Sequence, residues 1–286
     1  MAHCVIPGAE IILDKEFPVL DKGFVRLVDY MGGDERVVQS ARVSYGSGTK
    51  SYREDSGLID YLLRNRHTSP FEQVILTFHI KLPIFVARQW IRHRTARLNE
   101  ISGRYSVMKD DFYVPRPEDV AFQSNDNKQG RAEKIPGKEE AEQIRSILEK
   151  NQKLAYMEYT KLIDSNIARE LARINLPLSL YTEWYWQIDL NNLFHFLKLR
   201  LDAHAQKEIR LYGKILLEIA EKVAPLCCES FRQHILGGVN FSREEFEELK
   251  KRLEAAGDKE KACGETALSD KALERFEKKL ATGKQS

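Results

Sequence analysis

Residues 92–105, with the sequence RHRTARLNEISGRY, constrain the fold of this chain more than any other stretch. This arginine-rich segment holds four arginines, a histidine, a glutamate, an asparagine and a serine, with few aliphatic side chains among them. It cannot be buried as ordinary core, because its charges would lose their hydration without gaining enough partners. It is therefore either a solvated basic loop or a site for a ligand with several phosphates, since guanidinium groups match phosphate oxygens in pairs.

The near-neutral charge of the whole chain bears on the kind of ligand. Its 45 lysines and arginines stand against 43 aspartates and glutamates, which gives a formal net charge of +2 at pH 7. A nucleic-acid-binding surface usually extends a wider positive field than this balance supplies. We therefore expect no nucleic-acid partner. A basic binding patch and a purely structural assembly role stay open as alternatives to a small-molecule site.

The second half of the arginine-rich segment favours a small molecule. Glu100, Ser102 and Arg104 occupy every second position, so an extended backbone would direct all three side chains to the same side. Gly103 between them allows the backbone to turn or to lie close to a ligand. A carboxylate, a hydroxyl and a guanidinium on one side suit the binding of a polar small molecule.

Length and composition indicate a globular protein. The 286 residues, of which 42% are hydrophobic, can form one large domain or two small ones around a substantial core. No apolar run approaches the ~20 residues that span a bilayer, so we expect no membrane partner. The opening sequence MAHCVIPGAEIILDKEF carries acidic residues where a signal peptide needs an unbroken apolar stretch, so we expect a cytoplasmic location.

The cysteines show neither a disulfide framework nor the spacing of a zinc site. Cys4 and Cys263 lie far apart, and the adjacent Cys227 and Cys228 would rarely pair with each other. Glu229 follows directly, and its charge would raise the pKa of a neighbouring thiol instead of lowering it. We interpret Cys227 and Cys228 as structural and expect no metal, with a catalytic thiol as the alternative.

Hydrophobic periodicity predicts a mixture of strands and helices. The clearest strand covers residues 74–81, where apolar and polar side chains alternate. Residues 24–30 and 104–114 are predicted as further strands. Helical spacing predicts helices over residues 34–44, 58–64, 83–92, 139–165, 168–175 and 190–204, the last continuing to 224.

Two features of the predicted helices bear on a site. Pro83, which is tolerated in a first turn, begins the helix that ends at Arg92 and would hold the start of the arginine-rich segment in place. Arg200 and His204, four residues apart, would share one face of a later helix. Taken alone, that pair indicates a surface contact, and Arg173 indicates a salt bridge at a helix end.

Four blocks of the chain resemble the flavin-dependent thymidylate synthases. The segment RHRTARLNEISGRYS resembles the signature of that family, which begins Arg-His-Arg and ends Ser-x-Arg. Upstream, RHTSPFEQVILTFHIKLPIFVARQW resembles the family's lead-in; downstream, ARINLPLSLYTEWYW and LFHFLKLRLDAHAQKEIR resemble its other two blocks. All four occur in the family's order, and together they span most of the chain from about residue 23 to residue 237.

The resemblance implies an activity and a fold. It implies a methyltransferase that makes dTMP from dUMP, with 5,10-methylenetetrahydrofolate as carbon donor, FAD as redox cofactor and NADPH as reductant. No enzyme cysteine acts as a nucleophile in such a reaction. The implied fold is a single α+β domain, with a central, mostly antiparallel sheet flanked by helices. The implied assembly is a homotetramer whose active sites are shared between subunits.

The resemblance also implies residue roles. Arg200 would be catalytic, since a cation against the pyrimidine favours ionisation of N3 and makes C5 nucleophilic. The nucleotide would be bound by Gln89, Trp90, Ile91, Arg92, Glu100, Ile101, Ser102, Gly103, Arg104, Arg173 and Arg200, mainly through its phosphate. The flavin would be bound by His67, Ser69, Arg92, His93, Arg94, Glu100, Asp189, Asn191 and His195.

Three of these positions depart from the family's pattern. Members often carry asparagine or arginine where this chain has Asp189, Asn191 and His195. An aspartate beside a pyrophosphate would be repelled, so Asp189 would have to contact the ribose or adenine instead.

Three regions are expected along the chain. Residues 1–22 form an irregular N-terminal arm, residues 23–240 a flavin-dependent thymidylate synthase-like catalytic domain, and residues 241–286 a charged tail. Residues 116–140 are polar and without periodicity. We interpret them as a surface excursion of the domain, with a lid over the site as the alternative.

Overall fold

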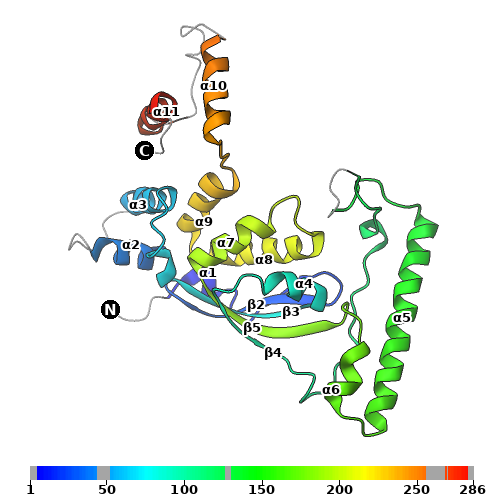
Figure 1. Ribbon diagram of the computed structural model, residues 1–286. Coiled ribbons are helices and arrows are strands. Elements are labelled where there is room, and N and C mark those ends of the chain that lie inside the picture. Colours follow the sequence, from blue (N-terminus) through cyan, green and yellow to red (C-terminus); the bar gives the residue numbers. More distant parts are fainter. Residues whose placement is uncertain (1–4, 44–51, 126–129, 256–267, 269, 283–286) are drawn as a thin grey trace. The chain divides into compact units, whose positions relative to one another are not determined.

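A computed structural model describes residues 5–43, 52–125, 130–255, 268 and 270–282. The chain forms two compact units, one of residues 1–235 and one of residues 236–286. The first unit contains a sheet with helices packed on it (Figure 1). Within the second unit the chain forms two helices, α10 (Arg243–Ala255) and α11 (Asp270–Thr282).

The sheet of the first unit has five strands, and all its neighbouring strands are antiparallel. The strand order is β1-β2-β3-β5-β4. The strands are β1 (Glu16–Val19), β2 (Gly23–Met31), β3 (Ile75–Pro83), β4 (Arg97–Glu100) and β5 (Tyr181–Asp189). This antiparallel sheet with flanking helices confirms the predicted α+β fold.

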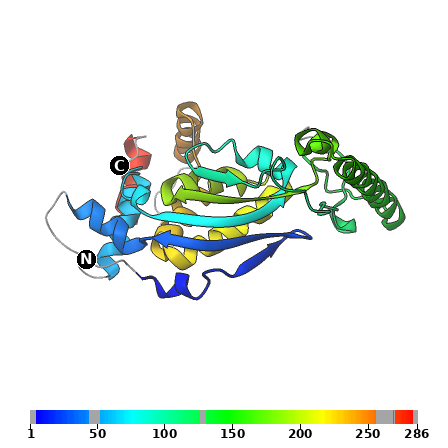
Figure 2. The ribbon, with the colours of Figure 1, turned by 90° about the horizontal axis from the view of Figure 1, so that it is seen from below.

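The alternation in β3 explains why helices cover one face of the sheet. Leu76, Phe78 and Ile80 are fully buried, whereas the intervening Thr77 and His79 are half-buried. The buried face is covered by α4 (Ile84–Trp90), α7 (Leu190–Arg200) and α8 (Lys207–Val223), as Figures 1 and 2 show. The opposite face carries polar side chains such as those of Arg26, His79 and Gln187.

Trp90, the last residue of α4, ties this layer together. Its ring centroid lies 5.1 Å from that of Trp186 in β5, 4.6 Å from that of Phe196 in α7 and 5.9 Å from that of Tyr212 in α8. All four rings are buried. Aromatic side chains bury large apolar areas, and the contacts with Trp186 and Tyr212 have the favoured edge-to-face geometry. The end of α4 is therefore fixed against the sheet and both covering helices.

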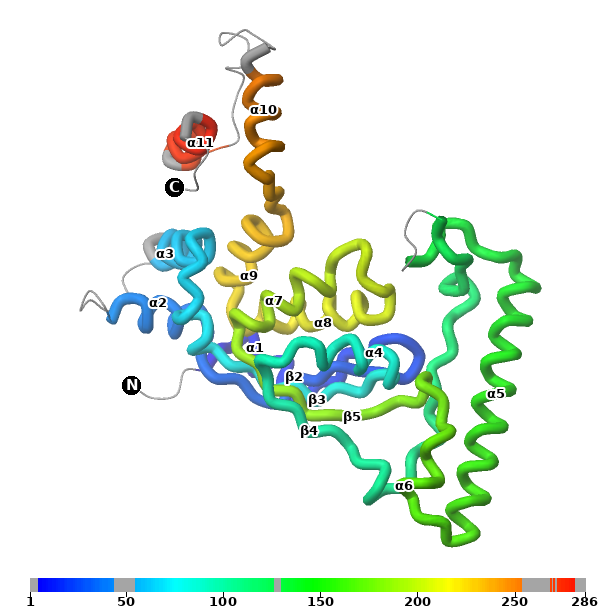
Figure 3. The backbone as a smooth tube through the Cα atoms, in the orientation of Figure 1, coloured from blue at the N-terminus to red at the C-terminus, as the bar shows by residue number. Residues whose placement is uncertain are grey.

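The remaining elements lie around this layer. Figure 3 shows the long helix α5 running beside the sheet. The helices are α1 (Pro7–Glu10), α2 (Asp34–Arg42), α3 (Tyr52–Arg64), α5 (Lys138–Asp164), α6 (Arg169–Ala172) and α9 (Pro225–Phe231). The 3-10 turns are η2 (Phe71–Gln73), η3 (Pro117–Asp119) and η4 (Arg173–Asn175), and a π-helical turn, η5 (Arg232–Leu236), follows α9. None of the helices in the described ranges is long and apolar enough to cross a membrane.

The prediction of a strand over residues 104–114 is wrong. Most of the backbone there lies outside any strand ladder: Tyr105 and Ser106 donate to the carbonyl of Ser102, and Met108 donates to the Tyr159 hydroxyl of α5. Near the end of the segment, the Asp111 carbonyl accepts from the N–H of Tyr181 at the start of β5. A single isolated bridge, at Phe112, is the only strand-like pairing of the segment. The strands β1, β4 and β5 were not predicted.

The long helix predicted from residue 190 to 224 is interrupted after Arg200. Asp202 causes the break, because its side chain accepts a hydrogen bond from the backbone N–H of His204 at 2.8 Å, which competes with helical pairing. His204 is turned to solvent, with 81% of its side chain exposed, and bonds Asp202. The predicted pairing of Arg200 with His204 on one helix face is therefore wrong.

Other regions are more ordered than predicted. Residues 5–22 are not irregular, because they contain α1 and β1. Residues 117–119 form η3, and Gln123 forms a bridge with Arg131. Cys4 and Cys263, like residues 126–129, lie outside the described residues. Cys227 and Cys228 lie buried in α9, and burial raises the pKa of both thiols well above its ordinary value, which agrees with a structural role.

Asp34 stabilises the start of α9 from a distant part of the chain. Its two carboxylate oxygens accept hydrogen bonds from the backbone N–H groups of Leu226 and Cys227, at 2.9 and 3.0 Å. The first N–H groups of a helix have no partner within the helix. We expect Asp34→Ala to lower the free energy of unfolding by about 1–2 kcal/mol, the usual cost of losing such a cap.

Urea unfolding monitored by circular dichroism measures that loss. Asp164→Ala is the control, because Asp164 is an exposed aspartate at the end of α5. The control should change the free energy of unfolding by less than about 0.5 kcal/mol. Equal effects of the two substitutions would contradict the capping role of Asp34.

Candidate active site

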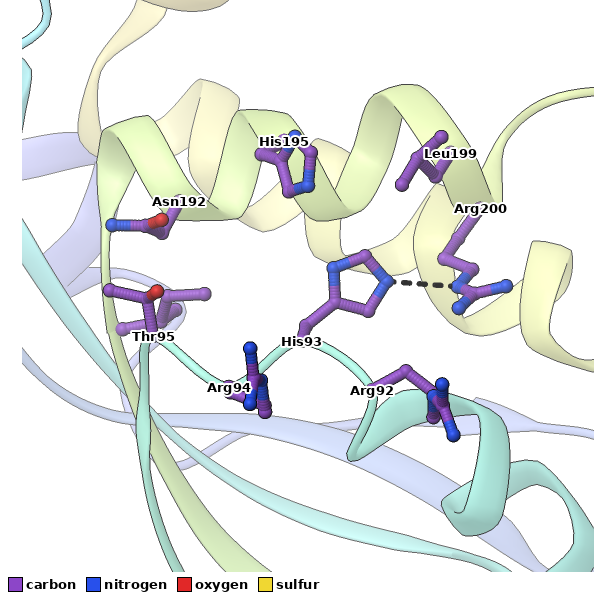
Figure 4. Close-up of a pocket in the computed structure, with 9 residues that line it drawn as sticks. Arg92, His93, Arg94, Thr95, Asn192, His195, Leu199 and Arg200 are labelled. Atoms are coloured by element: carbon purple, nitrogen blue, oxygen red, sulfur yellow. Dashed lines mark hydrogen bonds between the residues drawn. The ribbon is translucent and has the colours of Figure 1, made fainter.

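A cavity of about 280 Å³ lies between the end of α4 and the face of α7 (Figure 4). The turn after α4 forms one wall, and α7 forms the other. The sheet thus brings the start of the arginine-rich segment against residues about a hundred positions later in the chain. The lining residues are Arg92, His93, Arg94, Thr95, Ile188, Asn192, His195, Leu199 and Arg200.

Arg200, at the end of α7, is held by two uncharged acceptors. Its Nε donates to Nε2 of His93 at 3.0 Å, and its Nη2 donates to the backbone carbonyl of Gln89 at 3.0 Å. Burial lowers the pKa of Arg200 from its ordinary value. Within the described ranges, no carboxylate forms a salt bridge with this guanidinium. Its positive charge is therefore available to an anionic or electron-rich ligand.

His93 is a neutral base in this environment. Burial, the positive charge of Arg200 and the neighbouring His195 together lower its pKa to about 4, with burial the largest cause. Because Nε2 accepts from Arg200, the proton of the neutral ring belongs on Nδ1. The His93 ring also packs edge-on against Phe196 at 4.8 Å. The cavity therefore contains a fixed, uncharged N–H donor beside an uncompensated cation.

A second cationic group is centred on the turn of Ser102, Gly103 and Arg104. Arg104 donates from its backbone to the Ser102 hydroxyl at 3.3 Å, and its Nε lies 3.0 Å from Glu170 of α6. Gly103 is buried against Arg173: a Cβ at Gly103 would lie 3.0 Å from Cδ and 3.2 Å from Nη1 of that side chain. The turn thus holds two arginines and a hydroxyl close together.

The predicted extension of the backbone through Glu100, Ser102 and Arg104 is wrong. β4 ends at Glu100, whose carboxylate accepts from the Thr182 hydroxyl at 2.6 Å. The turn that follows is closed by bonds to the Ser102 carbonyl. The three side chains therefore do not share one side of a strand.

β4 separates the two cationic groups. At about 3.3 Å per extended residue, the chain from Thr95 to Ser102 can cover roughly 20 Å. No hydrogen bond or ion pair among the described residues joins Arg200 or His93 to Arg104 or Arg173. One chain therefore does not bring all the predicted nucleotide-binding residues into one cavity.

The predicted flavin-binding residues divide in a similar way. His67 and Asn191 line another cavity, of about 240 Å³, whose wall includes the stacked rings of Phe194 and Phe231. His195 lines both this cavity and the one at Arg200. Ser69 is exposed in the loop before η2.

Two predicted site residues, Asp189 and Trp90, have structural roles in the fold. Asp189 caps the N-terminus of α7, where it accepts from the backbone and the side-chain amide of Asn192 at 2.9 and 2.7 Å. The side chain of Trp90 is fully buried, so only its backbone can touch a ligand. Ile91 is partly exposed beside it, and Ile101 is exposed after β4.

Sequence reasoning missed several lining residues. Asn192 and Leu199 line the cavity at Arg200 together with the predicted His195, and their positions three residues before and four residues after His195 place all three on one face of α7. That spacing, counted from His195, could have identified them. Thr95 lies within the arginine-rich segment but was not selected.

Comparison with known proteins places the chain in a family. Residues 26–226 match the family model described as thymidylate synthase complementing protein, and residues 239–286 match that described as the thymidylate synthase ThyX C-terminal domain. The flavin-dependent thymidylate synthase of Treponema denticola is 63% identical over 273 residues, which cover 96% of this chain and 100% of that protein. The Treponema pallidum protein of the same name is 58% identical over 285 residues, covering 100% of this chain and 91% of the relative.

Solved structures agree with this result. The UMP/dUMP methylase PolB from Streptomyces cacaoi, bound with 5-Br dUMP, aligns with a TM-score of 0.69 at 34% identity, covering 77% of this chain and 98% of that one. Its complex with 5-Br UMP gives a TM-score of 0.68 at 33% identity, with 75% and 96% covered. The fold is therefore that of a class of enzymes that methylate uridine nucleotides. The chain belongs to the family of flavin-dependent thymidylate synthases.

The low pKa of His93 is directly testable. We expect its imidazole to titrate at about 4. Arg200→Gln should raise this pKa, because a nearby positive charge opposes protonation, yet leave it below 6.5, because burial remains. Between pH 6.5 and 4 the folded His93 binds fewer protons than the unfolded one, so its contribution to stability is lost as pH falls through that window.

Nuclear magnetic resonance of the His93 ring across this pH range measures the shift. Arg252→Gln is the control, since Arg252 pairs with Glu248 within α10. An unchanged His93 pKa in Arg200→Gln would show that the two side chains are not in contact.

Proposed function

We propose that this protein makes dTMP from dUMP by reductive methylation at C5 of the uracil ring. In this proposal 5,10-methylenetetrahydrofolate donates the carbon, FAD is the redox cofactor and NADPH is the reductant. The uncompensated charge of Arg200 is the single observation that carries the proposal, because a pyrimidine that must become nucleophilic at C5 needs a cation near its polar edge. Membership of the family and the dUMP analogue bound by the related methylase support it.

The residues at the cavity suit a flavin dinucleotide. Arg92, Arg94 and the Nδ1–H of His93 are donors for a pyrophosphate, and His195 connects this cavity to the aromatic-walled one that His67 lines. A neutral His93 is compatible with an electron-rich ring beside it. When bound, the flavin would supply the electrons that reduce the transferred carbon.

Arg200 would act on the pyrimidine. Its guanidinium would stabilise negative charge that develops on the uracil N3 and O4 as electron density moves to C5. His93 and the Gln89 carbonyl occupy two of its donor groups and hold its plane, so the remaining N–H groups keep a fixed direction. Because both partners are neutral, they orient the cation without cancelling its charge.

The phosphate of dUMP would be bound by the second cationic group. Arg104, Arg173 and the Ser102 hydroxyl are close together there, and Gly103 allows the backbone to approach an anion. Since β4 separates this group from Arg200, a complete site would combine the two groups from different copies of the chain.

Exposed apolar side chains beside the second group support such an assembly. Tyr105 is 77% exposed and Ile174 is 71% exposed, and they flank Arg104 and Arg173 along the chain. A contact with another copy of the chain would cover these apolar side chains, and such burial is favourable. We therefore propose a homotetramer whose active sites are shared between subunits.

The reaction itself is tested with the purified protein. We expect dTMP from dUMP, methylenetetrahydrofolate and NADPH, with a rate that depends on added FAD, and UMP should be assayed beside dUMP. Liquid chromatography of the nucleotides measures the product. Absence of any FAD-dependent product from a flavin-loaded protein would contradict the proposal.

Arg200→Ala tests the role of the cation. We expect the rate of dTMP formation to fall by about 10²–10³-fold, the usual cost of removing one group that stabilises developing charge. Flavin should stay bound, since Arg92, Arg94 and His93 remain. Arg200→Lys keeps the charge but loses the planar fork and should recover only part of the rate. Normal turnover in Arg200→Ala would exclude Arg200 from pyrimidine activation.

Gly103→Ala tests the second cationic group. The added methyl would press on Arg173 and on the Met108 sulfur, each 3.0 Å away, and should displace the arginine. We expect the KM for dUMP to rise about 10-fold, as for loss of one charge-assisted hydrogen bond, with little change in kcat. Gly57→Ala is the matched control, because a methyl there meets no atom within 4 Å. The same KM in both variants would remove Arg173 from nucleotide binding.

A further inference from the structure

A chain of hydrogen bonds leads from a buried carboxylate to the side chain of Gln89. Glu208, in the first turn of α8, is only 1% exposed. Its carboxylate accepts from the Tyr113 hydroxyl at 3.0 Å, from Arg131 and from the side-chain amide of Gln206 at 2.9 Å. The carbonyl oxygen of the Gln206 side chain in turn accepts from the side-chain amide of Gln89.

Glu208 is ionised and can only accept hydrogen bonds. Burial raises its pKa, but the hydrogen bond and the charge of Arg131 outweigh burial, so the pKa lies below its ordinary value. An ionised carboxylate has no proton to donate. Arg131 belongs to the polar segment of residues 116–140, so that segment helps to fix the charge of Glu208 beside the site.

Because Glu208 can only accept, it determines which group donates and which accepts in each hydrogen bond from Glu208 to Gln89. Gln206 must turn its NH₂ toward Glu208, which leaves its side-chain oxygen facing Gln89. Gln89 must then turn its own NH₂ toward Gln206. Its side-chain oxygen, Oε1, has no hydrogen-bond partner in the part of the chain that the structure describes. The backbone carbonyl of the same residue accepts from Arg200, which places Gln89 beside the catalytic cation.

We infer that Glu208 and Gln206 are positioning residues that fix the Gln89 amide so that its oxygen meets a hydrogen-bond donor of the nucleotide. This inference rests on the proposed function. It also changes the expected partner of Gln89, because a phosphate offers only acceptors and would repel the amide oxygen. The nucleotide groups of the right chemistry are a sugar hydroxyl and the ring N3–H.

The inference is tested by reversing the donor–acceptor direction of the hydrogen bonds that link Glu208, Gln206 and Gln89. In Gln89→Glu, a carboxylate stands at each end of Gln206, whose single NH₂ cannot serve both. In the double variant Gln89→Glu with Glu208→Gln, residue 208 can donate to the Gln206 oxygen, and Gln206 can then donate to residue 89. The second oxygen of that carboxylate still accepts from the nucleotide.

The measured quantities are the dissociation constant of dUMP by calorimetry and the split between KM and kcat. We expect Gln89→Glu to weaken dUMP binding by about 10–100-fold, since a buried acceptor loses its donor, and Glu208→Gln by about 10-fold. The double variant should bind more tightly than Gln89→Glu alone. If it binds as weakly as the product of the two single effects, or if Gln89→Glu binds normally, the inference is wrong.

A charge-neutral variant covers the case in which Glu208→Gln does not fold. Gln206→Met removes the hydrogen bonds of residue 206 to Glu208 and to Gln89 without changing any charge. We expect it to raise the KM for dUMP about 10-fold while flavin stays bound. Glu221→Gln is the matched control for Glu208→Gln, because it removes another α8 carboxylate that pairs with an arginine, Arg232. A KM for dUMP in Gln206→Met that equals that of the unaltered protein would overturn the inference.

Two analogues identify the donor. N3-methyl dUMP lacks the ring N–H, and 2′,3′-dideoxyuridylate lacks the sugar hydroxyl. The analogue that lacks the donor contacted by Gln89 should bind the unaltered protein more weakly than dUMP does. In Gln206→Met, where that contact is already lost, it should bind no more weakly than dUMP. If both analogues lose as much affinity in Gln206→Met as in the unaltered protein, Gln89 meets neither group and the inference fails. Failure of the unaltered protein to make dTMP would instead count against the proposed function.

Discussion

The antiparallel pairing of β3 with β5 is the constraint on which the cavity at Arg200 depends. Each strand continues directly into a helix, β3 into α4 and β5 into α7, so the two helices start at opposite ends of the same strand pair. α4 has seven residues and α7 has eleven, so at about 1.5 Å per residue they cover about 27 Å together, against about 30 Å for nine paired strand residues. Their C-terminal ends therefore meet over the sheet, as Figure 4 shows for Arg92 and Arg200. Cations at helix C-termini are favourable, which suits both arginines.

The hydrogen-bond partners of Arg200, where the ends of α4 and α7 meet, are uncharged. His93, whose pKa lies at about 4, and the Gln89 carbonyl hold Arg200 without neutralising it. The carboxylate of Glu208 forms its ion pair with Arg131. It can therefore orient the side-chain amides of Gln206 and Gln89 without neutralising Arg200. The positive charge of Arg200 is thus available to a ligand. β4 carries the rest of the arginine-rich segment away to Arg173, so one short segment supplies cations to two places in the fold.

Local patterns in the sequence predicted only part of this arrangement. β2, β3, α4 and α5 were predicted because alternation or helical spacing within a few residues is enough to specify them. β5 was not predicted, because its run of aromatic residues next to polar ones gains its stability from pairing with the distant β3. The break at Asp202 depends on one side chain that bonds the backbone two residues later. The residues of the site were selected through the family resemblance, but their division by β4 and the bonds from Glu208 to Gln89 follow from long-range packing that no local pattern encodes.

A site built from two copies of the chain is the central claim, and complementation between inactive variants tests it most directly. Arg200→Ala and Arg173→Ala would be expressed together, purified as mixed assemblies through two different tags and assayed for dTMP formation. If the two arginines serve one site from different subunits, some sites in the mixed assembly retain both, and activity well above that of either variant alone should return. If each chain supplies both arginines to its own site, every site in the mixture lacks one of them. Mixed assemblies as inactive as the separate variants would therefore contradict the claim.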